Sequence, residues 1–288
     1  QDTDFPFSPS SSSFSFSSCC AADAAAAANK EIEVDENYPE VVVSHTEKMD
    51  WFYIQKAHSP ELEKINQALA PSADGTAADE GVTDDYYTPG GPPRRGGLVL
   101  AKFTSDGTWY RARIEGIEGA STGKPSYRVM YIDFGNSEAL PIGHLRKCPL
   151  ALQDIPPQAM LCCLSGLLPP PEMDIEAAAF FENITQGLVF CCCVEKIDTQ
   201  KRRHIILTPQ ETSGSGKSGV TINERMVRQG LARLDKKSKA KIFHRLQVEE
   251  EAARKAHINV WRYGDCGADD EEDRYAFTTE RTRSTRRG

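Results

Sequence analysis

The sequence predicts a mainly β protein with added helices, an α+β fold built around two sets of short strands. Residues 98–140 contain short segments rich in β-branched and aromatic side chains, separated by turns rich in Gly and Asp. Similar segments recur before and after this stretch, and apolar residues at helical spacing occur between them. A chain of 288 residues is long enough for two domains, each with a buried core.

The N-terminal part predicts a hairpin followed by a helix. Residues 38–44 and 51–56 are β-branched and aromatic, and the turn-prone sequence HTEKMD lies between them. Ser59 can cap the next helix, Pro60 suits its first turn, and apolar residues repeat at helical spacing at Leu62, Ile65 and Leu69. The stretch 71–97 is rich in Gly and Pro and is predicted to be a loop.

The central segment predicts a small barrel. Strands are expected at 98–103, 108–115, 126–132 and 137–140, joined by tight turns. Four or five short antiparallel strands of this kind are typical of an SH3-like barrel. The sequence PIGHLRKCP that follows is predicted to be a turn.

The C-terminal part adds strands and helices. Strands are expected at 158–164, 188–197 and 203–208, and a helix is expected at 174–185. Thr221 and Glu224 have capping-box spacing, and Gly230 suits the position just past that helix. A last helix is predicted over 238–259, with one apolar face that consists of Ile242, Leu246, Ala253, His257 and Val260.

The two ends of the chain differ in composition from its body. Residues 1–37 are Ser- and Ala-rich and acidic, and residues 266–288 combine an acidic run with RTRSTRRG, so both are predicted to be disordered. Residues 1–40 hold eight acidic side chains and one lysine, and residues 265–288 hold seven acidic side chains and five arginines. The net charge of −8 therefore lies in the ends, and residues 41–264 are near neutral, at about +1.

Composition also limits the class of protein. No segment is typical of a signal peptide or a membrane span, and the nine cysteines lack the spacing of a zinc site. We expect reduced thiols in an intracellular protein, cytoplasmic and also nuclear, with no cofactor and no metal. Because the chain begins with Gln, we also expect it to be a piece of a longer protein.

An aromatic cluster is the candidate binding site. Phe103, Tyr110, Tyr131 and Phe134 occur in or beside the central strands, together with the amide of Asn136. Aromatic faces attract weakly hydrated cations, so converging rings form a site for a methylated ammonium or guanidinium group. The alternative is that these are ordinary core rings of a small barrel, and strand parity leaves both open. As cage residues the rings should lie partly exposed at a rim.

The order of the motifs AKF, WYRARI and YIDFGN resembles that of Tudor domains. The later sequence NERMVRQGLA, followed by a charged helix ending in HINVWRYGD, is similar to the end of a staphylococcal nuclease domain, an OB-type barrel. Together they resemble the C-terminal region of Tudor staphylococcal nucleases, in which a Tudor barrel is inserted into a nuclease-like domain. The resemblance implies a leader at 1–37, a first nuclease-like part with linker at 38–94, the Tudor barrel at 95–148, a second nuclease-like part at 149–265 and a tail at 266–288.

The same resemblance implies a function. Phe103, Tyr110, Tyr131, Phe134 and Asn136 fall on the cage positions of the family, and Asn136 is placed to bond a remaining N–H of the ligand. The ligand implied is symmetric dimethylarginine in the Arg-Gly-rich tails of RNA-processing proteins. The chain would then be a non-catalytic module of a larger protein of RNA silencing, splicing and transcription. Asp133 is weighed both as an attractive charge for the ligand and as a turn cap.

Two other functions are weighed against this one. An RNA-binding OB module would use the basic clusters Lys201, Arg202, Arg203, Lys236, Lys237 and Lys239. A nuclease would need clustered carboxylates for a metal ion, and the first hairpin offers only Glu47 and Asp50. The sequence GSGKSG at 214–219 lacks the first glycine of a phosphate-binding loop, since Glu211 stands there. We therefore expect this fragment not to be an enzyme.

Overall fold

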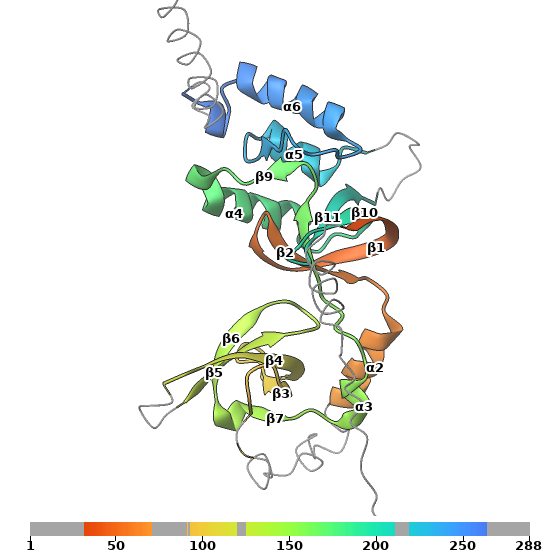
Figure 1. The fold of residues 1–288 in the computed structure, drawn as a ribbon, viewed down its shortest axis with the longest axis vertical. Coiled ribbons are helices and arrows are strands. Elements are labelled where there is room, and N and C mark those ends of the chain that lie inside the picture. The colour runs from red at the N-terminus through yellow and green to blue at the C-terminus, as the bar shows by residue number, and fades with distance from the viewer. Residues whose placement is uncertain (1–31, 71–90, 92, 120–124, 211–218, 264–288) are drawn as a thin grey trace, which may run out of the picture.

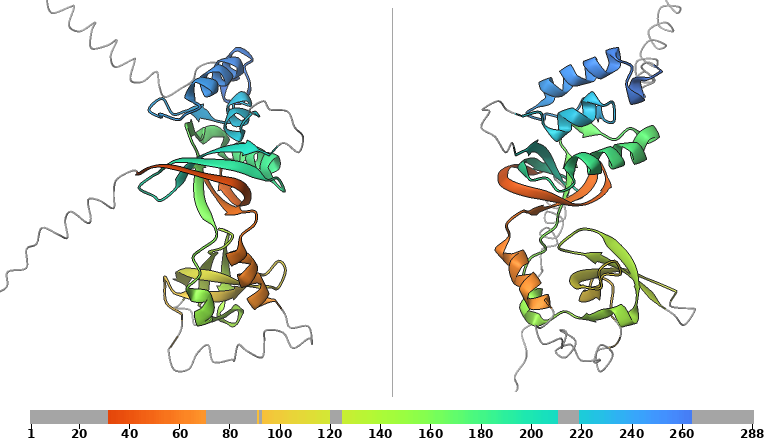
Figure 2. Two further views of the ribbon diagram at one scale, coloured as in Figure 1. Left: turned by 90° about the vertical axis from the view of Figure 1, so that its right-hand side faces the viewer. Right: turned by 180° about the vertical axis from the view of Figure 1, so that it is seen from behind.

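The chain forms two β structures that lie one above the other (Figure 1). The computed structural model describes residues 32–70, 91, 93–119, 125–210 and 219–263. In two further views the chain passes twice between the two structures, once through the helix α2 (Pro60–Leu69) and once after the helix α3 (Leu150–Gln153) (Figure 2). Among the described residues, no helix has the length and apolarity that a membrane crossing requires.

The first structure is a closed barrel of five strands in the order β1-β10-β11-β8-β2. Its strands are β1 (Ile32–Lys48), β2 (Trp51–Lys56), β8 (Met160–Leu164), β10 (Phe190–Ile197) and β11 (Arg203–Pro209). The long strand β1 pairs with β10 along its first half and with β2 along its second half, so it closes the barrel. Only β11 and β8 run parallel. The predicted OB-type barrel, with strands from both sides of an insertion, is confirmed.

Strand β1 is longer than predicted at both ends. It begins at Ile32, inside the segment 1–37 whose composition predicts a disordered leader, and Ile32 pairs with Ile197. It ends at Lys48, so most of the predicted turn HTEKMD is strand. The side chains of its first half are mostly exposed, and the backbone ladder to β10 holds it in place. Such a strand carries little apolar signal in its sequence.

The second structure is a strongly curved antiparallel sheet in the order β6-β5-β4-β3-β7. Its strands are β3 (Leu98–Lys102), β4 (Trp109–Glu118), β5 (Ser126–Tyr131), β6 (Ser137–Pro141) and β7 (Leu145–Lys147). The first four match the predicted strands, whereas β7 and the 3-10 helix η3 (Ile142–His144) lie where a turn was predicted. Strand β7 has a backbone partner in β3, which its short polar sequence LRK does not reveal.

Helices cover the ends of both structures. Helix α2 (Pro60–Leu69) begins as predicted, with the Ser59 hydroxyl accepting a hydrogen bond from the Leu62 amide at 3.2 Å. It packs Ile65 and Leu69 against Leu100 of β3 and Leu152 of α3. The other short elements are α3 (Leu150–Gln153), η4 (Pro171–Met173), η5 (Asn259–Trp261) and the strand pair β9 (Leu167–Leu168) and β12 (Arg233–Leu234).

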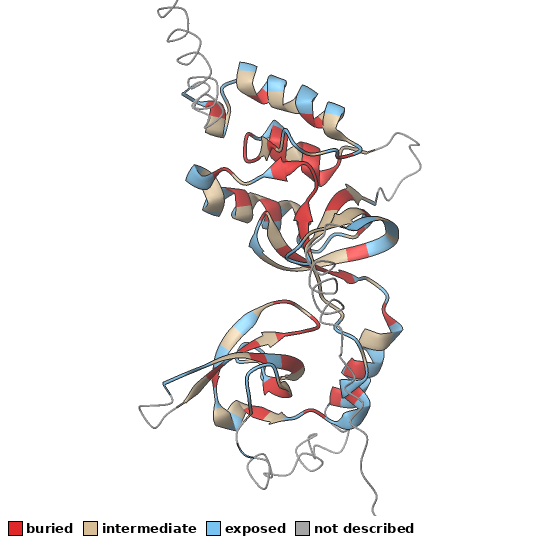
Figure 3. Cartoon of the chain, viewed as in Figure 1, coloured by how far each residue is buried: buried red, intermediate tan, exposed pale blue. Residues whose placement is uncertain are grey.

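Three helices complete the half of the molecule that contains the five-stranded barrel: α4 (Asp174–Thr185), α5 (Ile222–Arg228) and α6 (Phe243–Lys255). The capping box of Thr221 and Glu224 is present, as predicted. Helix α6 is shorter than the predicted 238–259. Glu195 accepts a hydrogen bond from the Lys241 amide and holds the preceding residues outside the helix, and His257 at φ 52 ends it. Buried residues lie in the barrel core and under these helices, and also within the curved sheet (Figure 3).

Candidate functional site

Four aromatic rings converge at one end of the curved sheet. Phe103 follows β3, Tyr110 lies in β4, Tyr131 ends β5, and Phe134 lies in the loop between β5 and β6. The ring centroids are 5.4 Å apart for Phe103 and Tyr131, 6.0 Å for Tyr110 and Tyr131, and 5.1 Å for Tyr110 and Phe134. Interplanar angles of 77° to 87° set the rings nearly perpendicular to one another. They line a cavity of about 330 Å³, so its walls are ring faces and ring edges.

The rings differ in burial. Tyr131 is only 1% exposed and belongs to the core of the curved sheet, with Ala112, Val129 and Leu140. The other three are partly exposed and pack against that core. The expectation that every ring lies at a rim is therefore wrong for Tyr131, which forms the floor. Both readings of the cluster apply to this ring, since it is a core residue and a cavity wall at once.

Two carboxylates hold the tyrosine hydroxyls. The Tyr131 hydroxyl donates to Oε2 of Glu138 at 2.9 Å, and the Tyr110 hydroxyl donates to Oδ2 of Asp106 at 2.8 Å. Burial and these hydrogen bonds raise the pKa of both tyrosines above its ordinary value. Although burial acts the other way, hydrogen bonds from Thr108 and Tyr110 lower the pKa of Asp106. Both hydroxyls therefore stay protonated, and Asp106 adds a negative charge to the cavity wall.

Asn136 occupies the remaining side of the cavity. A tight turn positions it: the Gly135 amide donates to the Tyr131 carbonyl at 2.7 Å, and the Tyr131 amide donates to the Asn136 carbonyl at 2.9 Å. The side chain of Asn136 lines the cavity and makes no hydrogen bond to another described residue. Its amide is thus available to a ligand inside the ring of aromatic side chains.

The five-stranded barrel contributes to the same cavity. Ser44 and His45 of β1 line it, and the Ser44 hydroxyl donates to the Phe134 carbonyl at 2.7 Å. Gly135 has φ +100, and a Cβ added there would lie 2.2 Å from Cγ of Tyr53 in β2. The loop that carries Phe134 and Asn136 therefore rests directly on β1 and β2. The sequence analysis did not identify Ser44, His45 and Asp106 as residues of the site. Ser44 and His45 could not be found from the sequence, because they meet the cage only through the tertiary fold.

A buried ion pair fixes the base of this loop. Arg111 is fully buried, and its Nε and Nη2 atoms donate to the two oxygens of Asp133 at 2.9 and 2.6 Å. The other guanidinium bonds go to the carbonyls of Leu152, Ile155 and Pro156. Asp133 is therefore not a charge that faces the ligand. It joins the curved sheet to the segment that returns to the barrel.

The comparisons with known proteins match both structures. Residues 33–166 match the model of the Tudor domain, and residues 176–263 match the model of staphylococcal nuclease homologues. The chain combines a Tudor domain with a staphylococcal nuclease domain. "Staphylococcal nuclease domain-containing protein 1" of Drosophila melanogaster is 30% identical over 241 residues, which cover 81% of this chain and 24% of that protein. "Ribonuclease TUDOR 1" of Arabidopsis thaliana is 28% identical over 249 residues, 77% of this chain and 23% of that protein.

Solved structures agree with this assignment. The extended Tudor domain of Drosophila Tudor-SN (p100) superposes with a TM-score of 0.65 at 28% identity, covering 79% of this chain and all of that one. The extended Tudor domain TD3 from mouse TDRD1, in complex with a MILI peptide containing dimethylarginine, superposes with a TM-score of 0.56 at 25% identity, covering 72% and 97%. The chain spans about a quarter of the length of the two curated relatives named above.

The basic residues lie in the nuclease-like half and form two groups. In the first, Arg202 donates to Asp198 at 2.9 Å, lies 3.5 Å from a carboxylate oxygen of Asp50 and rests over the Trp51 ring, so its charge is balanced. Lys201 is exposed in the turn before β11, and Arg203 is partly buried as the first residue of β11. Lys201 and Arg203 therefore lie beside Arg202 at the start of β11 but take no part in its ion pairs.

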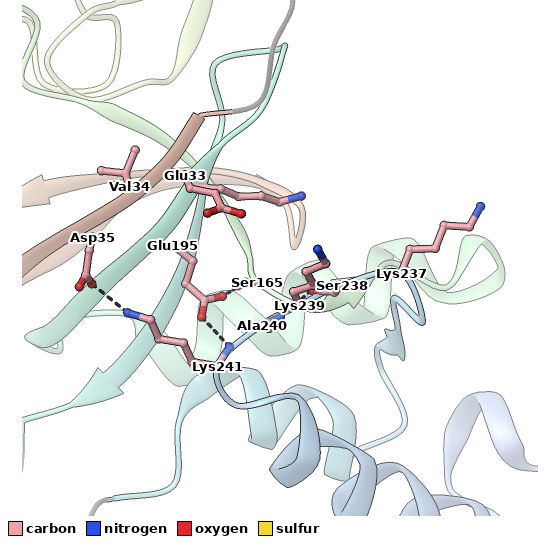
Figure 4. A pocket seen from close by; sticks show the side chains of 11 residues that line it. Glu33, Val34, Asp35, Ser165, Glu195, Lys237, Ser238, Lys239, Ala240 and Lys241 are labelled. Carbon is pink, nitrogen blue, oxygen red and sulfur yellow. Dashed lines mark hydrogen bonds and ion pairs between the residues drawn. The ribbon is translucent and has the colours of Figure 1, made fainter.

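The second group lies beside a groove. Lys237 and Lys239 line a cavity of about 690 Å³, together with residues of β1 and β10 (Figure 4). Lys236 is exposed on the same loop, next to Lys237. Acidic residues share this groove: Glu33, Asp35 and Glu195. The Lys241 ammonium is bound to Asp35 at 2.8 Å, so the groove carries charges of both signs.

No metal site is found in the part of the chain that the structure describes. Among those residues, no group of three or more His, Cys, Asp and Glu side chains is placed to hold an ion. Asp50, which sequence reasoning considered, instead lies beside the Arg202 guanidinium. Most of the sequence GSGKSG lies outside the described residues.

Proposed function

We propose that this chain binds peptides that carry dimethylarginine, through the cage of Phe103, Tyr110, Tyr131, Phe134 and Asn136. The observation that carries the proposal is the cavity itself, in which perpendicular rings surround a space with one unused amide. A planar guanidinium can lie against ring faces, and its remaining N–H can reach the amide of Asn136. The carboxylate of Asp106 at the wall favours a cation over a neutral side chain.

Methylation suits arginine to such a site. The modified guanidinium keeps its charge, but methyl groups weaken its hydration and remove some of its hydrogen-bond donors. The methylated guanidinium therefore loses less hydration free energy when it leaves water, while each cation–π contact contributes roughly 0.5–2 kcal/mol. Ordering the peptide and the partly exposed rings offsets part of this gain. The result is a weak site that selects for the modification.

The peptides proposed are Arg-Gly-rich tails of RNA-processing proteins, in the symmetric dimethyl form. The resemblance to the extended Tudor domain TD3 from mouse TDRD1, solved in complex with a MILI peptide containing dimethylarginine, supports this class of ligand. The curated relatives are longer than this chain, which supports the proposal that it is one module of a larger protein. We further propose that this larger protein acts in RNA metabolism and silencing, in the cytoplasm and the nucleus.

Titration calorimetry tests the proposal. One Arg-Gly peptide is supplied in unmethylated, asymmetric and symmetric dimethyl forms, and the symmetric form should bind most tightly. A Lys-Gly peptide trimethylated on lysine is the matched control, because it presents a methylated cation without a guanidinium plane. Equal affinity for all forms, or no binding of any form, would contradict the proposal that the cage recognises dimethylarginine.

RNA binding by the nuclease-like half is the second candidate. The observation that favours it is the exposure of Lys236, Lys237 and Lys239 along one loop beside the groove. It ranks second because Glu33, Asp35 and Glu195 line the same groove and reduce its attraction for phosphate. The dependence of binding on salt concentration distinguishes the two candidate functions. Phosphate binding should fall steeply between low and physiological ionic strength, whereas peptide binding in the cage should change little.

We further propose that this chain does not cleave nucleic acid, although it contains a staphylococcal nuclease domain and has relatives named ribonucleases. Metal-dependent cleavage needs several carboxylates on one cation and free cationic groups at the phosphate. Asp50 is instead paired with Arg202, and Glu195 is held by Ser165 and the Lys241 amide. Labelled RNA and DNA should stay intact with calcium as with chelator. Calcium-dependent products that vanish in Asp50→Ala or Glu195→Ala would contradict the proposal.

A further inference from the structure

An arginine-glycine turn lies at the start of the Tudor sheet. The sequence from 92 to 97 is PPRRGG, and the structure describes it from Pro93 onward. Arg94 and Arg95 are both exposed, and neither forms an ion pair or side-chain hydrogen bond with another described residue. Their guanidinium groups therefore stand in solvent next to a folded domain.

The turn is rigid in its backbone and open around its arginines. The Gly97 amide donates to the Arg94 carbonyl at 2.9 Å, and the Gly96 amide donates to the Ile114 carbonyl at 2.7 Å. Gly96 has φ +83, a conformation that favours glycine, and a Cβ added there would meet nothing within 4 Å. An enzyme that takes Arg95 into a narrow pocket would thus meet no side chain on the following residue.

Most of the other described arginines are placed differently, although Arg262 is exposed as well. Arg111 is buried on Asp133, Arg202 is paired with Asp198, and Arg228 is paired with Glu249. Arg113 is exposed, but it lies in the middle of β4, between Leu98 of β3 and Met130 of β5, and Ile114 follows it. Reaching that guanidinium with an enclosing active site requires opening two backbone ladders.

We propose that Arg95 is a site of arginine methylation. In the transfer, a guanidinium nitrogen forms a bond to the methyl carbon of a sulfonium donor of the S-adenosylmethionine class. The carbon–sulfur bond breaks, the sulfur keeps the electron pair as a thioether, and one proton leaves the nitrogen. A second transfer gives dimethylarginine, and the side chain remains a cation throughout. Modification therefore changes the hydration and hydrogen bonding of the turn without changing the charge of the domain.

The whole chain, folded, is incubated with labelled S-adenosylmethionine and a methyltransferase that forms symmetric dimethylarginine, and in a second arm with one that forms the asymmetric product. Peptide mass spectrometry should place the label on Arg95, roughly tenfold or more above Arg113, since the strand must open first. The variant Arg95→Lys should lose this label, while the matched control Arg113→Lys keeps it. Unchanged melting of both variants shows that the fold is intact.

Three outcomes overturn the proposal. Label spread evenly over Arg94, Arg95 and Arg113 would show no selectivity for the turn. Label absent from Arg95 with both enzymes, although a peptide of residues 90–99 is modified, would show that the folded turn excludes the enzyme. Label absent from protein and peptide alike would show that the sequence is no substrate. None of these outcomes depends on the cage, so they leave the proposed function to its own test.

Discussion

The guanidinium of Arg111 and the carboxylate of Asp133 lie face to face, and their side chains are 0% and 2% exposed. Arg111 comes from the middle of the Tudor sheet, and Asp133 stands at the base of the loop that carries Phe134 and Asn136. The remaining donors of Arg111 bind carbonyls of the segment that leads back to the nuclease-like barrel. One ion pair thus links the sheet, the cage loop and the domain connection.

Removing one partner of this pair should be costly. The variant Asp133→Ala leaves a buried guanidinium without its counter-charge, and we expect a loss of about 3–5 kcal/mol in the free energy of unfolding. The matched control is Glu118→Ala, which removes an exposed carboxylate 3.9 Å from Arg128 and should cost about 0–1 kcal/mol. Urea unfolding measures both. Equal small losses would mean that carbonyl oxygens alone can hold Arg111.

The cage rings should separate into two classes on mutation. Phe103 is partly exposed, so Phe103→Ala should abolish binding of a dimethylarginine peptide with little change in melting temperature. Tyr131 is also core, and Tyr131→Ala should abolish binding and cost about 3–5 kcal/mol of stability, as for other large core rings. Tyr127→Phe, in the same core but away from the cavity, is the control for binding. A stable Tyr131→Ala variant would contradict the burial argument.

Gly135 should be irreplaceable where the two domains meet. In Gly135→Ala the new methyl group would overlap the Tyr53 ring at 2.2 Å, and φ +100 strains any side chain. We expect a loss of at least about 1–3 kcal/mol, together with weaker peptide binding, because the cage loop must shift. Gly143→Ala is the control, since a Cβ there meets nothing within 4 Å. Calorimetry and thermal melting should both distinguish the two variants.

Peptide affinity should fall on mild acidification because of His45. Burial lowers the pKa of this cavity residue, although Glu47 and Glu182 act in the opposite direction. At neutral pH the imidazole is therefore neutral, and a cationic ligand meets no repulsion. As the pH falls below 6.5, the ordinary value, and through the lowered pKa, His45 gains a charge and repels the ligand. Asp106 stays ionised in this range, because its own pKa is lowered.

The same acidification should also destabilise the fold. The folded state binds fewer protons than the unfolded state at a histidine with a lowered pKa, so stability is lost as the pH falls from the unfolded value to the folded one. His204 has a lowered pKa as well, through burial and Lys196, but it lies outside the cage cavity.

Replacing His45 with Gln should remove the pH dependence of peptide binding, whereas His204→Gln should leave that dependence unchanged. The opposite pattern, measured by calorimetry from pH 7.5 to 5.5, would rule out His45.

The parts of the fold that could be predicted are those with local signals. The caps at Ser59 and Thr221 fix two helix starts through their own neighbours, and the strands of the Tudor sheet follow from short apolar patterns. Strand β1 could not be bounded, because its first half is held by backbone pairing with β10 while its side chains face solvent. The start of helix α6 depends on Glu195, which is distant in sequence.

The candidate site divides in the same way. The structure brings the five predicted cage residues around one cavity, since they lie within one small sheet and its loops. Arg111 could not be recognised as a buried cation from the alternating sequence WYRARI, where its position looks like a solvent-facing one. Ser44 and His45 join the site only when the five-stranded barrel packs against the cage loop.

The loop that rests on Tyr53 has a consequence for how this module can be moved between proteins. Its cage residues lie in one continuous stretch, but the surface that supports them comes from β1 and β2, on the far side of the linker. The smallest unit that keeps the cage supported therefore includes β1 and β2 as well as the sheet. A fusion protein that contains only the inserted sheet would include the aromatic rings but not the strands β1 and β2 that support them. A fusion that begins at β1 and continues through the return segment would include both.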